Sequence, residues 1–251
     1  MRTLIVNDDG VDSPGIAVLA RVAYEAGLDV TVAAPSVDRS GTSAALTSLE
    51  ENGRMVIERR TIAGLPDVEV TAVEASPAMI VFVSASGAFG PEPELVLSGI
   101  NHGPNTGHAV LHSGTVGAAF TAANQGARAV ALSMDSATPE HWDTAAEVAR
   151  RAIDWVGEAA PPGTVLNVNI PDVAVGSLRG IRPAPLAAFG AVQAEITDAS
   201  STFVAVSFIP VRAGESERSD SGLLRTGWAT VTLIRAPSEI SNIDLSGLTT
   251  G

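Results

Sequence analysis

The chain has 251 residues, 45% of them apolar, which is enough for one large domain or one domain with an appendage. Its formal net charge of −13 disfavours a nucleic acid polymer as partner, because the phosphate backbone would be repelled. Cysteine and lysine are absent, which excludes disulfides, zinc–thiolate sites, iron–sulfur clusters, a Walker A site and a Schiff-base enzyme.

The sequence contains no run of about 18 uncharged apolar residues, so no membrane helix is expected. The apolar run after Arg2 ends before Asp8, which is too short for the apolar region of a signal peptide. We therefore expect a cytoplasmic protein without a membrane partner.

Strand and helix patterns alternate over residues 1–171. Strands are predicted at residues 3–6, 29–34, 68–73, 94–97, 129–133 and 165–170. Helices are predicted from Pro14, after Ser13 as N-cap, to a close at Gly27, and at residues 77–84, 114–124 and 139–158. This order predicts an α/β fold with a mostly parallel sheet and helices on both faces, which binds ligands beyond the carboxyl ends of its strands.

The pattern changes after residue 171. Residues 204–209 and 228–234 predict strands, with weaker candidates near 178–181 and 192–196, and polar loops separate them. We therefore divide the chain into a core at 1–171 and a C-terminal antiparallel β extension at 172–251, which would serve for oligomerisation and return in part to the core.

Two adjacent carboxylates, Asp8 and Asp9, follow the first predicted strand. Two ionised carboxylates in contact repel each other, so one would be protonated unless a cation compensates. Their hard oxygen atoms suit Mg²⁺, Mn²⁺ or Ca²⁺. The alternative interpretation is an Asp-rich turn, because Asp-Gly is common in turns.

The loop after the second predicted strand reads APSVDRSGTS at residues 34–43. Ser40 offers a metal ligand, and Arg39 or Asp38 offers a group that orients a ligand. Taken in isolation, the loop is more typical of an ordinary polar surface.

A third stretch, SGINHGPNTGHAVLHSGTVGAA at residues 98–119, predicts a polar loop of roughly 15 residues, which is unusual without a function in a compact α/β domain. Ser113, Gly114 and Thr115 begin the next helix, where free N–H groups, hydroxyls and the helix dipole suit a phosphate. Asn101 and Asn105 add neutral amide groups. The spacing is not GxGxxG, so dinucleotide binding is poorly supported.

Three histidines, His102, His108 and His112, lie in the same loop. Their spacing matches no standard zinc motif, so a general acid or a substrate contact is favoured over zinc ligation. The fourth histidine, His141, is expected at the surface near a helix start.

Taken together, these stretches resemble the SurE family of metal-dependent survival-protein nucleotidases. The resemblance rests on NDDGVDSPGI, APSVDRSGTSAALT, ELVLSGINHGPNTGHAVLHSGTVGAAFTA and NVNIP, which begin at residues 7, 34, 94 and 167. It covers residues 1–171 strongly and the remainder weakly. It implies a Rossmann-like core whose C-terminal extension exchanges between subunits of a homodimer or homotetramer.

The resemblance also implies an activity, a cofactor and a site. The activity is hydrolysis of nucleoside 5′- or 3′-monophosphates with one divalent cation, Mg²⁺ or Mn²⁺, with Ca²⁺ as a substitute in a crystal. The implied metal ligands are Asp8, Asp9, Ser40 and Asn101, and Asp8, Asp9 and Asn101 are the catalytic candidates. The implied phosphate and substrate contacts are Gly10, Ser40, Gly41, Asn105, Ser113, Gly114 and Thr115.

One departure from the family bears on substrate choice. The residues ASPAMI at 75–80 stand where the family usually has Gly-Thr-Pro-Ala-Asp-Cys, so a carboxylate is lost and Ser76 replaces a threonine. Two alternatives therefore stay open: a phosphatase for a non-nucleotide phosphoester in a biosynthetic pathway, and a non-catalytic homologue that binds a nucleotide or metabolite. A haloacid-dehalogenase-type phosphatase is disfavoured, because that class needs Asp-x-Asp and usually a lysine.

Overall fold

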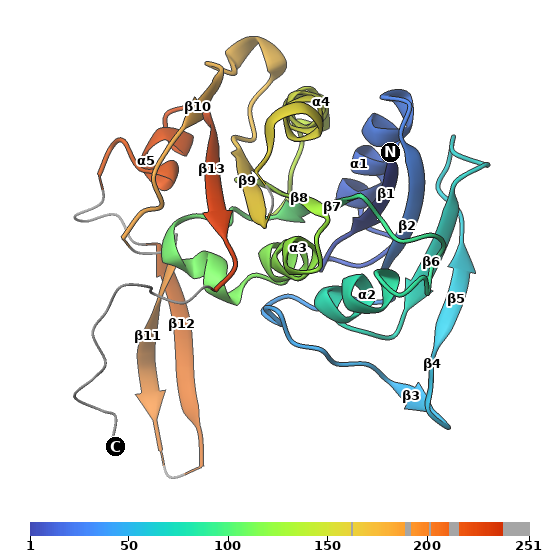
Figure 1. The fold of residues 1–251 in the computed structure, drawn as a ribbon. Helices are drawn as coiled ribbons and strands as arrows, with labels where there is room; N and C mark the ends of the chain where they lie inside the picture. Colours follow the sequence, from blue (N-terminus) through green and yellow to red (C-terminus); the bar gives the residue numbers. More distant parts are fainter. Residues whose placement is uncertain (162, 189–191, 201, 211–215, 238–251) are drawn as a thin grey trace, which may run out of the picture.

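The computed structural model describes residues 1–161, 163–188, 192–200, 202–210 and 216–237. A nine-stranded sheet forms its centre, in the order β10-β13-β9-β8-β7-β1-β2-β6-β5 (Figure 1). These strands are β1 (Arg2–Val6), β2 (Asp29–Pro35), β5 (Ile57–Arg60), β6 (Glu69–Val73), β7 (Leu95–His102), β8 (Arg128–Met134), β9 (Thr164–Ile170), β10 (Ile181–Pro183) and β13 (Ala229–Arg235). The six neighbours from β9 to β6 run parallel, so their carboxyl ends meet at one edge.

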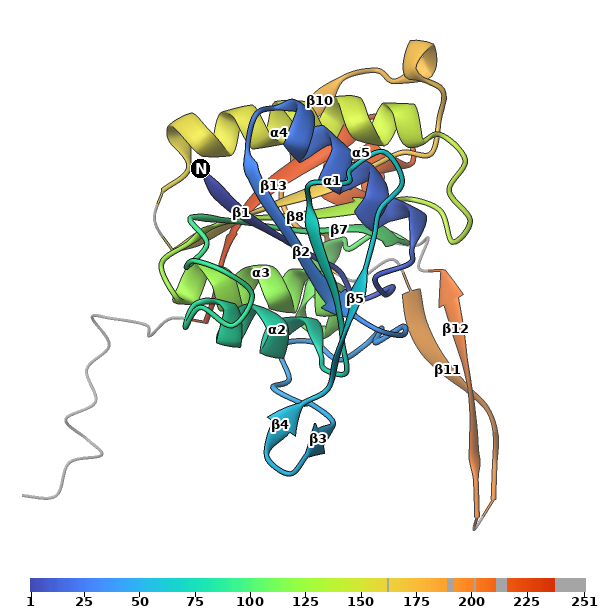
Figure 2. The ribbon, with the colours of Figure 1, turned by 90° about the vertical axis from the view of Figure 1, so that its right-hand side faces the viewer.

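Helices cover both faces of the sheet, as Figure 2 shows. One face carries α1 (Pro14–Glu25) and α4 (Trp142–Ala159), and the other carries α2 (Pro77–Ser84) and α3 (Gly114–Asn124). Strand alternation divides the core between these layers: Ile5 joins the cluster under α1 and α4, whereas Leu4 and Val6 join the cluster under α2 and α3. Two hydrophobic layers therefore enclose the central strands.

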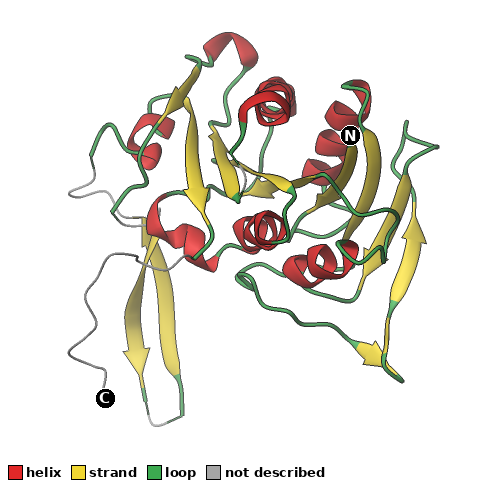
Figure 3. Ribbon diagram, in the orientation of Figure 1, coloured by secondary structure: helices red, strands yellow, loops and turns green. Residues whose placement is uncertain are grey.

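The C-terminal part contributes to the sheet and also stands off from it. Strand β13 pairs antiparallel with β9, β10 pairs parallel with β13, and α5 (Asp220–Leu224) packs beside them. Strands β11 (Val192–Ala199) and β12 (Val204–Pro210) form a separate antiparallel hairpin that extends away from the sheet (Figure 3). A smaller hairpin joins β3 (Glu50–Glu51) and β4 (Arg54–Met55).

The predicted α/β class, the mostly parallel sheet with helices on both faces and the antiparallel pairing in the C-terminal part are confirmed. Some details differ from the prediction. Strand β7 continues to His102, so the predicted long loop is shorter and contains a 3₁₀ helix at Gly107–His112. Helix α4 begins at Trp142 rather than at residue 139. The predicted strand at 228–234 is β13, which runs from Ala229 to Arg235 in the central sheet. The division at residue 171 stays a prediction.

Among the described residues, no helix is both long enough and apolar enough to cross a lipid bilayer.

Candidate active site

A tight turn at the carboxyl end of β1 presents the two adjacent carboxylates. The buried Asn7 side chain donates from Nδ2 to the Gly10 carbonyl (3.0 Å) and to Ser13 Oγ (2.7 Å). Its Oδ1 accepts the Gly10 N–H (3.2 Å), and Gly10 has a φ of +102°, which favours glycine. Ser13 occupies the N-cap position of α1 but makes no side-chain capping bond. Asn7 therefore fixes the turn that carries Asp8 and Asp9.

Asp8 lies against the first turn of α3. The buried Thr115 hydroxyl donates a hydrogen bond to Asp8 Oδ1. A Cβ added at Gly114 would stand only 2.7 Å from Asp8 Oδ2, so a larger residue there would displace the carboxylate. Asp8, predicted as a metal ligand, is therefore in contact with Thr115, which was predicted as a phosphate contact. The Thr115 hydroxyl is directed at Asp8.

The amino terminus of α3 keeps groups that suit an anion. Ser113 caps the helix as predicted, because its Oγ accepts the Val116 N–H (3.1 Å) and its own hydroxyl proton stays free to donate elsewhere. The first-turn N–H groups of Gly114 and Thr115 add the positive end of the helix dipole.

The electrostatics of the pair favour a cation. Burial raises the pKa of Asp8, and hydrogen bonds from Thr115 only partly oppose that effect. Burial and the nearby charge of Asp8 raise the pKa of Asp9 to about 6, against the effect of the His102 N–H, which donates to Asp9 Oδ2 (3.2 Å). Both carboxylates are thus less easily ionised than usual, and a bound divalent cation would relieve that cost.

The loop after β2 is attached to the same turn. The Arg39 N–H donates to the Asp8 carbonyl (2.7 Å), so the residue before Ser40 is bonded to the backbone of the turn that carries the carboxylate pair. The Ser40 N–H donates to Asp38 Oδ1 (2.7 Å), and the Ser40 side chain is exposed. Gly41 follows with a φ of +77°. The structure therefore brings this loop to the site, with Ser40 and Gly41 at its exposed tip.

The far end of this loop packs on α3. Ser43 Oγ donates to the Leu111 carbonyl (2.7 Å), and a Cβ at Gly117 would come within 2.3 Å of the Ser43 carbonyl oxygen. The second and third sequence motifs are thus joined directly.

Asn101 enters from β7 on the other side of β1. Its Nδ2 donates to the Gly103 carbonyl (2.7 Å), so Oδ1 is the atom that Asn101 would offer to a cation. The next residue, His102, donates its N–H to Asp9, so Asn101 is held close to the pair.

Asn105 is held by a polar clamp on β8 and β9. Its N–H donates to Asn169 Oδ1 (2.7 Å) and its Nδ2 donates to Ser133 Oγ (2.8 Å). Its carbonyl accepts from Nδ2 of Asn167 (2.9 Å) and of Asn169 (3.0 Å). Sequence reasoning missed this role, although two asparagines at alternate positions of an otherwise apolar strand were a usable signal.

A second support comes from the C-terminal segment. The fully buried Asp220, at the start of α5, accepts the Gly107 N–H (2.8 Å) and the Ala187 N–H (2.9 Å). No local sequence signal links residues 107 and 220, because their contact depends on the return of the chain to the sheet.

The histidines do not gather into a metal site. The His102 ring packs against Trp142 with centroids 5.7 Å apart, whereas His108 and His112 are exposed. The described part of the chain contains no group of three His, Asp or Glu side chains that could hold a metal ion. A cation at this edge would therefore need neutral oxygens beside Asp8 and Asp9, and Ser40 and Asn101 supply that chemistry.

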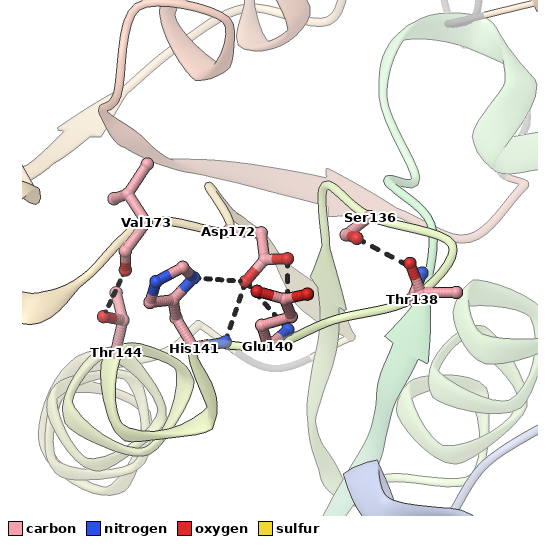
Figure 4. A network of polar contacts seen from close by, with 7 residues as sticks. All are labelled: Ser136, Thr138, Glu140, His141, Thr144, Asp172 and Val173. Atoms are coloured by element: carbon pink, nitrogen blue, oxygen red, sulfur yellow. Dashed lines mark hydrogen bonds and ion pairs between the residues drawn. The ribbon is translucent and has the colours of Figure 1, made fainter.

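The start of α4 is fixed by Asp172, as Figure 4 shows. This carboxylate accepts the N–H groups of Glu140 (3.1 Å) and His141 (2.9 Å) and lies 2.9 Å from His141 Nδ1. The residues before Trp142 therefore do not continue the helix, which explains its late start. Because α4 begins here, Trp142 is held against His102.

The fold defines a class: an α/β protein with a mostly parallel sheet, whose candidate ligand site lies at the carboxyl ends of β1, β2 and β7. The family model described as Survival protein SurE matches residues 3–192, and the chain belongs to this family.

Relatives and a solved structure agree with this assignment. The chain is 39% identical over 189 residues to the 5′-nucleotidase SurE of Methylococcus capsulatus, covering 75% of this chain and 71% of that protein. It is 42% identical over 185 residues to the 5′-nucleotidase SurE of Synechococcus elongatus, covering 72% and 69%. The crystal structure of the SurE protein from Aquifex aeolicus matches with a TM-score of 0.77 and 27% identity, covering 94% of this chain and 93% of that one.

Proposed function

We propose that this chain is a divalent-metal-dependent phosphomonoesterase that hydrolyses nucleoside monophosphates. The observation that carries the proposal is the position of Asp8, which is buried against the amino terminus of α3 beside Asp9. An anionic pair beside a helix amino terminus would set a cation next to a bound phosphate, and that combination supports the proposal of metal-assisted phosphoester hydrolysis. Relatives named 5′-nucleotidase SurE and, from Edwardsiella ictaluri, 5′/3′-nucleotidase SurE support the substrate class.

In this proposal Asp8, Asp9, Ser40 and Asn101 hold the cation, which is Mg²⁺ or Mn²⁺. When bound, the cation supplies positive charge at the phosphoryl group.

The other roles follow from the contacts of each side chain. The first-turn N–H groups of α3 and the Ser113 hydroxyl bind the remaining phosphate oxygens, because they form the positive end of the helix. Asn105 is held on the same edge by its clamp. Asp8 is committed to Thr115, so the half-buried Asp9 is the carboxylate that orients the attacking water.

Purified protein assayed with Mn²⁺ or Mg²⁺ tests the proposal. The substrates are nucleoside 5′- and 3′-monophosphates, polyphosphate and sugar phosphates. We expect turnover of nucleoside monophosphates that disappears with EDTA and returns with added cation. Binding without turnover would favour a non-catalytic homologue, and a clear preference for another phosphoester would overturn the substrate class.

A further inference from the structure

A groove of about 280 Å³ opens at the carboxyl end of β6, beside the candidate site. It is lined by Arg39, Thr47, Ser48, Leu49, Glu74, Ala75 and Ser76. In the sheet, β6 stands two strands from β1, which corresponds to roughly 10 Å at ordinary strand spacing. The distance between the groove and the carboxylate pair is therefore about the distance between the phosphate and the base of a mononucleotide.

A fixed charge pair lies in this groove. Arg39 Nη2 is 3.4 Å from Glu74 Oε2, and Ser36 Oγ donates to Glu74 Oε1 (2.5 Å). The Arg39 and Glu74 side chains are 37% and 31% exposed, so a ligand can reach both. Because the Arg39 N–H is bonded to the Asp8 carbonyl, the pair is tied to the cation site through a single residue.

The rest of the wall is ordered by Ser76. Its Oγ accepts the N–H groups of Thr47 (3.2 Å) and Met79 (3.4 Å), and it donates to the Ala45 carbonyl. Ser76 thus caps α2 and ties the loop after β2 to this helix. The wall also includes Leu49, which is 57% exposed and offers an apolar surface.

These groups match the chemistry of a nucleoside. A carboxylate only accepts hydrogen bonds when it is ionised, and the adjacent hydroxyls of ribose are donors that a fixed carboxylate can take. An exposed leucine suits the apolar face of a base. Glu74 also disfavours a second phosphate at this position, because like charges repel.

We propose that this groove binds the nucleoside part of a ribonucleoside monophosphate, with Glu74 accepting from the ribose hydroxyls and Arg39 holding Glu74 in place. The inference rests on the proposed function and adds a specificity-determining residue to it. Leu49 covers one face of the base.

The test compares Glu74→Gln with a matched control, Glu69→Gln. Glu69 lies at the opposite end of β6 and pairs with Arg59 at the surface. Each variant is assayed with AMP, dAMP and p-nitrophenyl phosphate, and adenosine binding is measured by calorimetry. We expect Glu74→Gln to lower the ratio of kcat/KM for AMP to that for p-nitrophenyl phosphate about tenfold, the effect of one lost charged hydrogen bond. The preference for AMP over dAMP should shrink, and Glu69→Gln should change neither ratio.

Leu49→Asp is a second variant that leaves the Arg39–Glu74 pair in place. We expect it to weaken adenosine binding about tenfold, through lost apolar contact with the base. Equal loss on all three substrates in Glu74→Gln, with unchanged adenosine binding in both variants, would overturn the groove, because it would show a merely structural role.

Failure of the groove and failure of the proposed function give different results. Protein that binds adenosine through Glu74 but hydrolyses no phosphoester would support the groove and overturn the phosphatase. Cation-dependent hydrolysis of AMP that Glu74→Gln and Leu49→Asp leave unchanged would support the phosphatase and overturn the groove as a nucleoside site.

Discussion

Ionised Asp9 lowers the stability of the folded protein by an amount that can be measured. Its pKa is raised from 3.8 to about 6 by burial and by Asp8, so its ionised form is disfavoured by folding. The cost is absent below about pH 3, where Asp9 is protonated in both states, grows between about pH 4 and pH 6, and is fully present above about pH 6. Since Asp9 is partly exposed, solvent screening reduces the cost to about 1–2 kcal/mol.

We therefore expect Asp9→Asn to be more stable than the parent chain at pH 7 in EDTA, and equally stable near pH 3. Urea unfolding between pH 3 and pH 7.5 measures the difference. A variant that is less stable than the parent at pH 7 would contradict the conclusion that ionised Asp9, half-buried beside Asp8, destabilises the fold. The same pKa predicts that cation binding weakens as the pH falls through about 6, because protonated Asp9 competes with the ion.

Gly114 shows how closely Asp8 fits the helix. A Cβ there would lie 2.7 Å from Asp8 Oδ2, so we expect Gly114→Ala to shift the carboxylate, weaken Mn²⁺ binding and cost about 1–3 kcal/mol of stability. Gly157, which also lies in a helix, has no atom within 4 Å of an added Cβ. Gly157→Ala should therefore be neutral or stabilising by about 0.5–1 kcal/mol. Equal effects of the two substitutions on thermal unfolding and Mn²⁺ affinity would argue against the close fit.

Residue types at the site were predictable, but the contacts between them were only partly so. Asp8 and Asp9 stood out because two adjacent carboxylates at a strand end repel each other unless one is protonated or a cation compensates. That Thr115 donates to Asp8 was not predictable, because 107 residues separate them and only the packing of α3 on β1 brings them together.

At the level of elements, short polar segments support the site from outside it. The fully buried Asp220 of α5 accepts the backbone N–H groups of Gly107, Ala187 and Ser221, and Gly107 belongs to the loop that carries Asn105. Removal of this carboxylate takes the acceptor away from all three donors.

We expect Asp220→Ala to lower the free energy of unfolding by about 2–4 kcal/mol and to raise KM for a nucleoside monophosphate. Asp154→Ala, on the exposed side of α4, is the control and should change stability by less than about 0.5 kcal/mol. Denaturant unfolding and steady-state kinetics measure both. An unchanged KM in Asp220→Ala would show that α5 does not position the loop.

Helices and strands with a clear hydrophobic periodicity or a clear start signal were predictable, and those without either were not. The helices α2 and α3 match their predicted bounds, because a proline or a capping serine marks each start. Strand β5 and the β3–β4 hairpin were missed, since the segment EENGRMVIERR at residues 50–60 has no clear alternation. The late start of α4 depends on Asp172, which lies in a different segment.

On the scale of the whole molecule, the β11–β12 hairpin stands away from the sheet (Figure 1). Some of its apolar side chains are exposed. Ile196 and Val206 form a cross-strand pair and are 68% and 49% exposed. Exposed apolar surface of this kind is typical of an interface. We therefore propose that the hairpin packs against a second copy of the chain in a homodimer or homotetramer.

Replacing Ile196 and Val206 together with Asp places charge in that interface. We expect light scattering to show an oligomer for the parent chain and a monomer for the double variant. Replacing the exposed Val37 and Val175, which lie outside the hairpin, with Asp should leave the oligomer intact. A parent chain that is monomeric at every concentration would contradict the proposal.

The large-scale fold was predictable as far as the β-α-β alternation extends. The path of the last strands was not, because β13 joins β9 after a long excursion through the hairpin. Sequence alternation identifies a strand but does not select its partner.

The central claim is that Asp8 and Asp9 hold a cation that phosphate hydrolysis requires. Its most direct test is the Mn²⁺-dependent turnover of AMP by the parent chain and by Asp8→Asn, with thermal unfolding of both. We predict turnover in the parent that EDTA abolishes, and a loss of at least about 100-fold in a folded Asp8→Asn protein. Near-normal turnover of AMP by folded Asp8→Asn, or turnover that persists in EDTA, would contradict the claim.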